Sequence, residues 1–279
     1  IQPQGSFNYE FTPPDAGTYW YHPHAHSAEQ VGRGLMGALI IEEPDPPPVD
    51  RDVVWVLVDF RLRDDASIAG GFNILMEISM SGRIGNTVTI NGRVPDRFPV
   101  RSGERIRRRL INAAPARIFA LDFKGHRPLV VAFDGQPVEP HPPEGGRVVL
   151  GPAMRTDLVL DMTGRPGSTA PVLDTFYKGL EYTLVDLSCS NEPALRVQAL
   201  APPAKLPPNP IPEPDVASAQ HHDVTLTGGM MGGMGTGGGM MGGTGMMGAG
   251  TGGMMGGGAM WKINGVAMPG EDMGTCNRF

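Results

Sequence analysis

Short apolar runs separated by turn residues recur along most of the 279-residue chain. Each run has the length of a strand, and no segment shows the longer apolar period of a helix. Many of the 28 prolines and 40 glycines fall between the runs, where they interrupt regular structure. The pattern predicts an all-β fold in which residues 47–195 form one complete β-sandwich or Greek-key barrel. The runs that carry this prediction are 53–60, 87–92, 105–113, 117–123, 128–135, 146–152, 156–162 and 182–188.

Residues 1–46 predict the closing part of another β domain. The strand TYWYHPH (18–24) is followed by a polar, glycine-rich loop and by the apolar strand LMGALIIEE (35–43). The proline-rich stretch 44–51 then acts as a stiff linker. Because residues 1–46 resemble the later strands of a domain whose opening strands are missing, we expect the chain to be a fragment of a longer protein.

The last third of the chain changes composition. Residues 196–227 form a second proline-rich linker, long enough to cross the surface of another domain. Residues 228–260 contain only Gly, Met, Thr and Ala, and residues 261–279 open a new strand pair near 261–266. We interpret residues 261–279 as the start of a further domain.

Charge and hydropathy exclude some classes of function. A net charge of -6 gives no electrostatic reason to expect a nucleic-acid partner. The locally basic run RSGERIRRRL (101–110) alternates Ile106, Arg108 and Leu110 against Arg107 and Arg109, which predicts a strand with one solvated face. No apolar stretch is long enough to span a membrane, and no signal peptide is recognised.

The stretch YWYHPHAH (19–26) contains three of the seven histidines at alternate positions. His22 and His24 would lie on the same side of an extended strand, about 7 Å apart along the chain. Pro23 restricts both its own backbone and that of His22, so the pair is stiffened. Neutral imidazole is a common ligand of copper and zinc, and two such donors form half of a site. The alternative is a solvated or hydrogen-bonded histidine-rich strand end.

Longer motifs resemble those of the multicopper oxidases, a family that includes laccases and bacterial cuprous oxidases. The resemblance rests on DAGTYWYHPHAH (15–26), GRGLMGALIIEEP (32–44), INGRVPDRFPVRSGERIRRRLINAAPARIFALDFKGH (90–126), DGQPVEP (134–140) and GPAMRTDLVLD (151–161). It implies tandem cupredoxin-like domains and copper in type 1, type 2 and type 3 centres. It also implies that Cu(I) or a phenol-like reductant is oxidised in one-electron steps while dioxygen is reduced to water. A periplasmic or secreted location follows from the family alone.

The resemblance assigns roles to few residues of this chain. His22 and His24 match the pair that binds the two type 3 coppers, one histidine to each copper, whereas His26 has no ligand role in that motif. The other histidine motifs of the family are not found. Cys189 and Cys276 lack flanking histidines, so neither resembles the type 1 ligand, and we expect the chain to be inactive alone. Arg108 stands where the family usually has an apolar residue.

The segment 228–260 offers a second possible copper site. Thioethers are soft ligands that favour Cu(I), and ten of them lie close together in the sequence. A methionine-rich insert at this place resembles the bacterial cuprous oxidases. The alternative is a flexible linker whose methionines are incidental. The candidate ligands are Met230, Met231, Met234, Met240, Met241, Met246, Met247, Met254, Met255 and Met260.

Two other classes of function stay open from the sequence. One is a non-enzymatic copper-binding or copper-tolerance protein, and the other is a cupredoxin-fold structural protein that has lost its coppers. Retention of His22 and His24 speaks against the second. We further expect Asp134 and Gly135 to form a turn and Asp157 to be a hydrogen-bonding residue at a strand end. A disulfide between Cys189 and Cys276 is left open.

Overall fold

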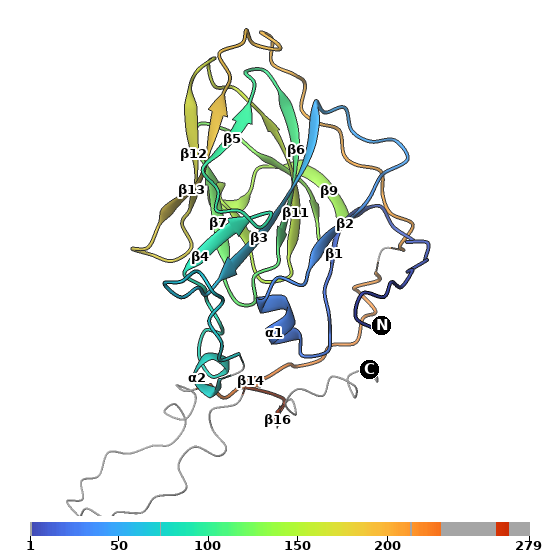
Figure 1. The fold of residues 1–279 in the computed structure, drawn as a ribbon. Coiled ribbons are helices and arrows are strands. Elements are labelled where there is room, and N and C mark those ends of the chain that lie inside the picture. The colour runs from blue at the N-terminus through green and yellow to red at the C-terminus, as the bar shows by residue number, and fades with distance from the viewer. Residues whose placement is uncertain (1, 73, 213, 230–260, 268–279) are drawn as a thin grey trace, which may run out of the picture.

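The computed structural model describes residues 2–72, 74–212, 214–229 and 261–267 (Figure 1). Apart from three short helical turns, its regular elements are strands. The first two strands, β1 (Gly17–Tyr21) and β2 (Gly37–Ile41), pair antiparallel and are joined through α1 (Ser27–Gly32). The predicted strand 18–24 therefore ends at Tyr21, since Pro23 has no N–H to donate to a ladder.

Residues 51–189 form a β-sandwich of two sheets. One sheet has five strands in the order β10–β7–β12–β13–β5, and the other has six in the order β4–β3–β6–β11–β8–β9. The bounds are β3 (Arg51–Phe60), β4 (Thr87–Ile90), β5 (Arg97–Val100), β6 (Arg105–Asn112), β7 (Phe119–Phe123), β8 (Leu129–Phe133), β9 (Gln136–His141), β10 (Val148–Leu150), β11 (Arg155–Asp161), β12 (Thr169–Asp174) and β13 (Tyr182–Cys189). Two further short elements, α2 (Leu75–Ile78) and η1 (Glu144–Gly146), lie in loops.

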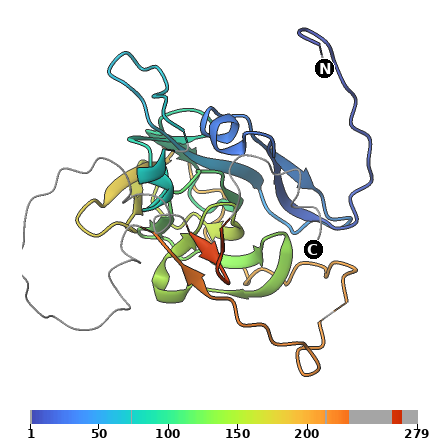
Figure 2. The ribbon, with the colours of Figure 1, turned by 90° about the horizontal axis from the view of Figure 1, so that it is seen from below.

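The six-stranded sheet is covered on both faces. One face packs against the five-stranded sheet through a core that includes Trp55, Leu110 and Phe119. The other face carries Val58 and Ile111, which pack against the β1–β2 pair. The molecule therefore has three layers over this part of the sheet, and Figure 2 shows the N-terminal arm leaving them.

The basic strand is the largest departure from the sequence prediction. Every residue of β6 is buried, including Arg107, Arg108 and Arg109. The predicted alternation is present, because Arg108 faces the core while Arg107 and Arg109 face the opposite side. The prediction that one face of this strand is solvated is wrong, because β1 and the segment after β2 cover that face.

The second proline-rich linker crosses the sandwich, as its length predicted (Figure 1). Leu206 is buried against Val131, Ala132 and Val159 of the six-stranded sheet. Residues 45–49 of the first linker and 203–207 of the second line one cavity of about 210 Å³. The two linkers therefore lie side by side on the sheet.

A small three-stranded sheet ends the described chain. It contains β14 (Leu226–Thr227), β15 (Lys262–Ile263) and β16 (Val266–Ala267). Asn264 and Gly265 connect the last two strands with positive φ angles of 50° and 81°, as an Asn-Gly hairpin turn requires. The strand pair predicted near residues 261–266 is thus present. The ten candidate methionines and Cys276 lie outside the described residues.

Candidate metal centre

His22 and His24 follow directly after β1 and stay on one side of the chain. The imidazole of His22 stacks on the ring of Trp20, with 4.0 Å between ring centroids and 21° between planes. The rings of His22 and His24 stack in turn, at 4.9 Å and 22°. The three side chains form a ladder at alternate positions, so the predicted common face continues past the end of the strand.

The two histidines differ in exposure. His22 is half-buried, and its Nδ1 atom is buried without a hydrogen-bond partner among the described residues. His24 is exposed. Burial, and then the nearby His24, lowers the pKa of His22 below its usual value. Both effects favour the neutral imidazole, which is the form that binds a metal.

A cavity of about 420 Å³ lies beside this histidine pair. Phe72, Glu77 and Arg83, from the loop between β3 and β4, form one wall of the cavity. Pro115 and Pro152 line another part of it. Glu77 is buried and ion-paired with Arg61 and Arg83. The second carboxylate oxygen of Glu77 has no partner in the described part of the chain.

The donor set of this chain fits half of a copper site. Two stiffly placed imidazoles, one with an unpartnered buried nitrogen, open on a cavity large enough for a small ligand. No cluster of three or more His, Cys, Asp or Glu side chains suited to a metal occurs among the residues that the structure describes. Further ligands for an ion held by His22 and His24 would thus have to come from elsewhere.

Apart from His26, which caps the start of α1 two residues after His24, the other histidines lie away from this pair. His126 follows β7, and His141 is the exposed last residue of β9, where its ring is hydrogen-bonded to the backbone oxygen of Glu139 at 2.7 Å. His221 and His222 are exposed in the second linker. Cys189 is a free, buried thiol within the described chain.

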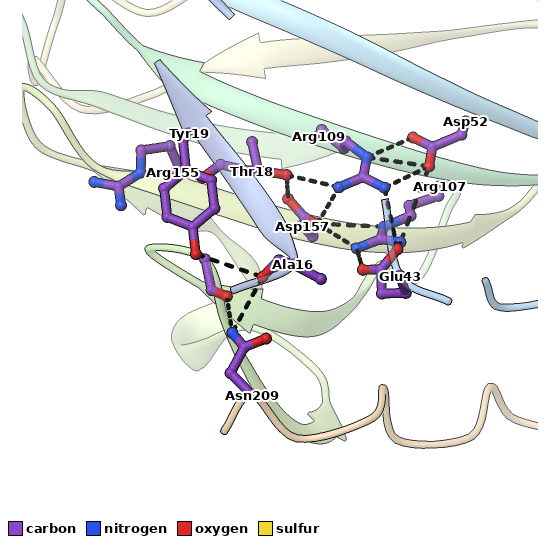
Figure 3. A network of polar contacts seen from close by, with 11 residues as sticks. Ala16, Thr18, Tyr19, Glu43, Asp52, Arg107, Arg109, Arg155, Asp157 and Asn209 are labelled. Carbon is purple, nitrogen blue, oxygen red and sulfur yellow. Dashed lines mark hydrogen bonds and ion pairs between the residues drawn. The ribbon is translucent and has the colours of Figure 1, made fainter. Parts of the chain in front are cut away.

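A buried ionic network connects β1 to the sandwich (Figure 3). Arg107 donates to both carboxylate oxygens of Glu43, at 2.7 and 2.9 Å, and to Asp157 at 2.7 Å. Arg109 donates to both oxygens of Asp52, with distances from 2.8 to 3.0 Å. Thr18 of β1 donates to Asp157 at 2.7 Å. The network therefore joins β1, the segment after β2, β3, β6 and β11.

Sequence reasoning missed the centre of this network. Asp157 lies in the middle of β11 and is 2% exposed, so its predicted position at a strand end is wrong. A charged residue directly before the apolar run LVL in TDLVLDM is the signal that a buried ionic partner exists. The partner of Asp157 cannot be read from the same segment, because Arg107 and Arg109 are about fifty residues away. Asp134 and Gly135 do form the predicted turn, both with positive φ.

Comparison with known proteins agrees with the geometry. Two family models, both described as multicopper oxidase, match residues 1–46 and 65–169. The chain belongs to the multicopper oxidase family. It is 28% identical to multicopper oxidase MmcO of Mycobacterium tuberculosis over 194 residues, which are 59% of this chain and 37% of that protein. It is 30% identical to cell division protein FtsP of Edwardsiella tarda, over 73% of this chain and 46% of that protein.

Solved multicopper oxidase structures share the fold. The enzyme of Pseudomonas parafulva is 34% identical with a TM-score of 0.66, over 77% of this chain and 50% of that one. The enzyme of Pseudomonas thermotolerans is 31% identical with a TM-score of 0.67, over 76% and 49%. The all-β, cupredoxin-like fold class is thereby confirmed, and the family implies copper centres in the full-length protein. The chain spans about half the length of these multicopper oxidases.

No helix in the described parts of the chain is long and apolar enough to cross a bilayer.

Proposed function

We propose that this chain forms part of a multicopper oxidase and that His22 and His24 hold one type 3 copper each. The stacked pair beside the 420 Å³ cavity carries the proposal, because it places two imidazoles at the edge of a space that can admit dioxygen. Copper, when bound, would supply one-electron redox chemistry between a reductant and dioxygen.

The residues of the chain have defined tasks in this proposal. His22 and His24 bind through unprotonated nitrogens, and Trp20 holds the ring of His22 by stacking. Phe72 and the neighbouring prolines line the cavity with apolar surface, which limits access of bulk water. Arg61 and Arg83 hold the Glu77 side chain at the wall and balance its charge. We propose that residues 1–46 and 47–195 are the cupredoxin units, with 196–227 and 228–260 as connecting segments and 261–279 as the start of a third unit.

The substrate is proposed to be Cu(I) or a phenol-like reductant, with dioxygen as the acceptor. The ten methionines of residues 228–260 favour Cu(I), since thioethers prefer that ion. Similarity to copper resistance protein A of Pseudomonas syringae supports a role in copper handling. A periplasmic or secreted location is proposed from the family resemblance alone.

Metal content and oxygen uptake test the proposal. The 279-residue chain and the longer protein that contains it are reconstituted with copper. We expect the longer protein to bind copper and consume oxygen, and the 279 residues alone to consume none, because they supply only two of the family's ligand histidines. His22→Ala and His24→Ala are expected to abolish oxygen uptake by the longer protein, while His141→Ala, an exposed control, retains it. Retained uptake in both the His22 and the His24 variant would reject the ligand assignment.

Copper sequestration is a second candidate, favoured by the methionine composition. It predicts that the chain binds several Cu(I) ions in competition with a chromogenic chelator, and that replacing the ten methionines with leucine abolishes this binding. A structural role without copper is the third candidate, and it is favoured by similarity to FtsP, a relative named for cell division rather than for an oxidase activity. Copper binding that depends on His22 and His24 would argue against that role.

A further inference from the structure

The β1–β2 pair needs support from outside itself. It is a sheet of only two strands, and an isolated pair of strands is marginally stable at best. Pairing with β2 fixes the register of β1, from Gly17 opposite Ile41 to Tyr21 opposite Gly37. It leaves the rotation of β1 about its own axis to be set by side-chain contacts with the sandwich, and that rotation decides where the side chains of alternate residues point.

Thr18 makes the polar contact that can set this rotation (Figure 3). Its side chain is 1% exposed and donates from Oγ1 to Asp157 Oδ1 at 2.7 Å. The Thr18 Oγ1 atom also accepts a hydrogen bond from Arg109 Nη1 at 3.0 Å. A hydroxyl that both donates and accepts has little freedom to turn, so the start of β1 is anchored at a defined angle.

Asp157 is itself held firmly. Its Oδ2 atom accepts from Arg107 Nη2 at 2.7 Å and Nε at 3.2 Å. It lies in the middle of β11, which pairs with strands on both sides. The anchor for Thr18 is thus part of the sandwich rather than of a loop, which suits a group that must hold a fixed geometry.

The anchored face of β1 leads directly to the candidate ligands. Thr18, Trp20 and His22 occupy alternate positions, and Trp20 packs on the apolar cluster of Val58 and Ile111. Trp20 then stacks on His22, and His22 on His24. A turn of the strand at Thr18 would therefore move every ring in the ladder, because each is in contact with the next.

We propose that Thr18 and Asp157 are positioning residues for the candidate metal centre: their hydrogen bond fixes the rotation of β1 and so aims His22 and His24 into the cavity. The inference rests on the proposed function in one respect, that the two imidazoles are copper ligands. The positioning itself is a property of the protein without metal.

The test uses the whole 279-residue chain and four variants. Thr18→Val removes the hydroxyl at nearly constant volume, Thr18→Ser keeps it, and Asp157→Asn weakens the acceptor. Asp161→Asn is the matched control, because Asp161 lies on the same strand and holds Arg105 through two hydrogen bonds, at 2.6 and 2.7 Å, yet makes no contact with β1. Amide hydrogen exchange of residues 17–22 and the imidazole NMR signals of His22 and His24 are measured without metal. The Cu(II) EPR spectrum is recorded after adding the metal alone.

In Thr18→Val and Asp157→Asn we expect exchange of the β1 amides to rise about tenfold, the effect of losing one net hydrogen bond. The ring signals of His22 and His24 should shift and the Cu(II) EPR spectrum broaden, whereas Thr18→Ser should restore the original values. Asp161→Asn should leave the β1 exchange, the ring signals and the EPR spectrum unchanged, even if it lowers the melting temperature as much as Thr18→Val does. Unchanged β1 exchange and ring signals in folded Thr18→Val would overturn the inference, and an equal response in Asp161→Asn would assign the effect to general loss of stability.

Failure of the proposed function would look different. If the original chain binds no Cu(II) through His22 and His24, as judged with His22→Ala, the ligand assignment fails. The exchange and ring-signal measurements on the metal-free chain still decide whether Thr18 and Asp157 position the two histidines.

Discussion

At the scale of single residues, Arg108 is the feature least expected from a β-sandwich. Its guanidinium carbon lies 3.9 Å from the ring centroid of Trp55 and 4.1 Å from that of Phe98. Two of its nitrogens, Nε and Nη1, are buried without a hydrogen-bond partner in the described structure. Cation–π contacts offset only part of the cost of burying this charge.

We expect Arg108→Leu to stabilise the protein. Replacing a poorly paired buried charge by an apolar side chain is stabilising by about 1–4 kcal/mol in comparable cases. Urea unfolding at neutral pH measures the change in the free energy of unfolding. The adjacent Arg107→Leu should act in the opposite sense, by about 3–5 kcal/mol, because it leaves Glu43 and Asp157 buried without their partner. A clear loss of stability in Arg108→Leu would show that the cation–π contacts outweigh the cost of burying the charge.

The same residue predicts a pH dependence. Burial, and then the charge of Arg51, lowers the pKa of Arg108 from its ordinary value to about 9. Below about pH 9 both the folded and the unfolded chain hold the proton, so the destabilising effect of the charge is constant. Above about pH 9, and up to the ordinary pKa of an arginine, the unfolded chain binds more protons, so the original protein gains stability relative to Arg108→Leu.

We therefore expect the stability difference between the original protein and Arg108→Leu to be flat from about pH 6 to 8 and to narrow toward pH 10.5. Urea unfolding of both proteins across this range measures it, and changes elsewhere in the chain cancel in the difference. A difference that widens above pH 9 contradicts the lowered pKa.

At the scale of elements, the strands could be predicted from the sequence, whereas the partners of buried charges could not. Runs such as 53–60 and 182–188 are strands because local apolar patterning is sufficient to define them. The second covered face of β6 is not local information, since the covering strand β1 lies about ninety residues earlier. His22 and His24 could be named from their spacing, but the cavity beside them is built by the loop between β3 and β4.

The second linker gives a prediction at this scale. Leu206 is 4% exposed, and the Asn209 side-chain nitrogen donates to the backbone oxygens of Ala16 and Gly135 at 3.1 and 3.0 Å. We expect Leu206→Ser to release the linker, because its only buried apolar anchor among the described residues of 196–227 is lost. Limited proteolysis should then cut at Lys205 at least tenfold faster, with Leu200→Ser as the partly exposed control. Equal cleavage rates would show that the proline-rich backbone alone resists the protease.

At the scale of the whole molecule, the three layers are joined by charge as well as by apolar contact. Glu43 follows β2 and holds Arg107 of the sandwich with both of its oxygens. Hydrogen bonds to Arg107 and the charge of Arg109 lower the pKa of Glu43 in spite of its burial. The pair β1–β2 should therefore unfold together with the sandwich.

We expect calorimetry to show one cooperative transition for the original chain, with equal calorimetric and van't Hoff enthalpies. Glu43→Gln should lower the melting temperature and split the transition, because the β1–β2 pair loses its strongest link. Glu42→Gln is the control from the same segment, since Glu42 is exposed and makes no hydrogen bond or ion pair with the residues that the structure describes. A single sharp transition in Glu43→Gln would mean that the apolar contacts of Trp20 are sufficient for cooperativity.

The docked linker has a consequence for whatever follows residue 227. If all of residues 196–227 were loose, the next folded unit could explore a sphere set by more than thirty residues of flexible tether. Because the chain is pinned at Leu206 and Asn209, the free tether starts only after residue 209. A shorter tether raises the effective concentration of the following unit at the surface beside it. The ordering entropy of the pinned half has already been lost in folding, so docking of that unit costs correspondingly less.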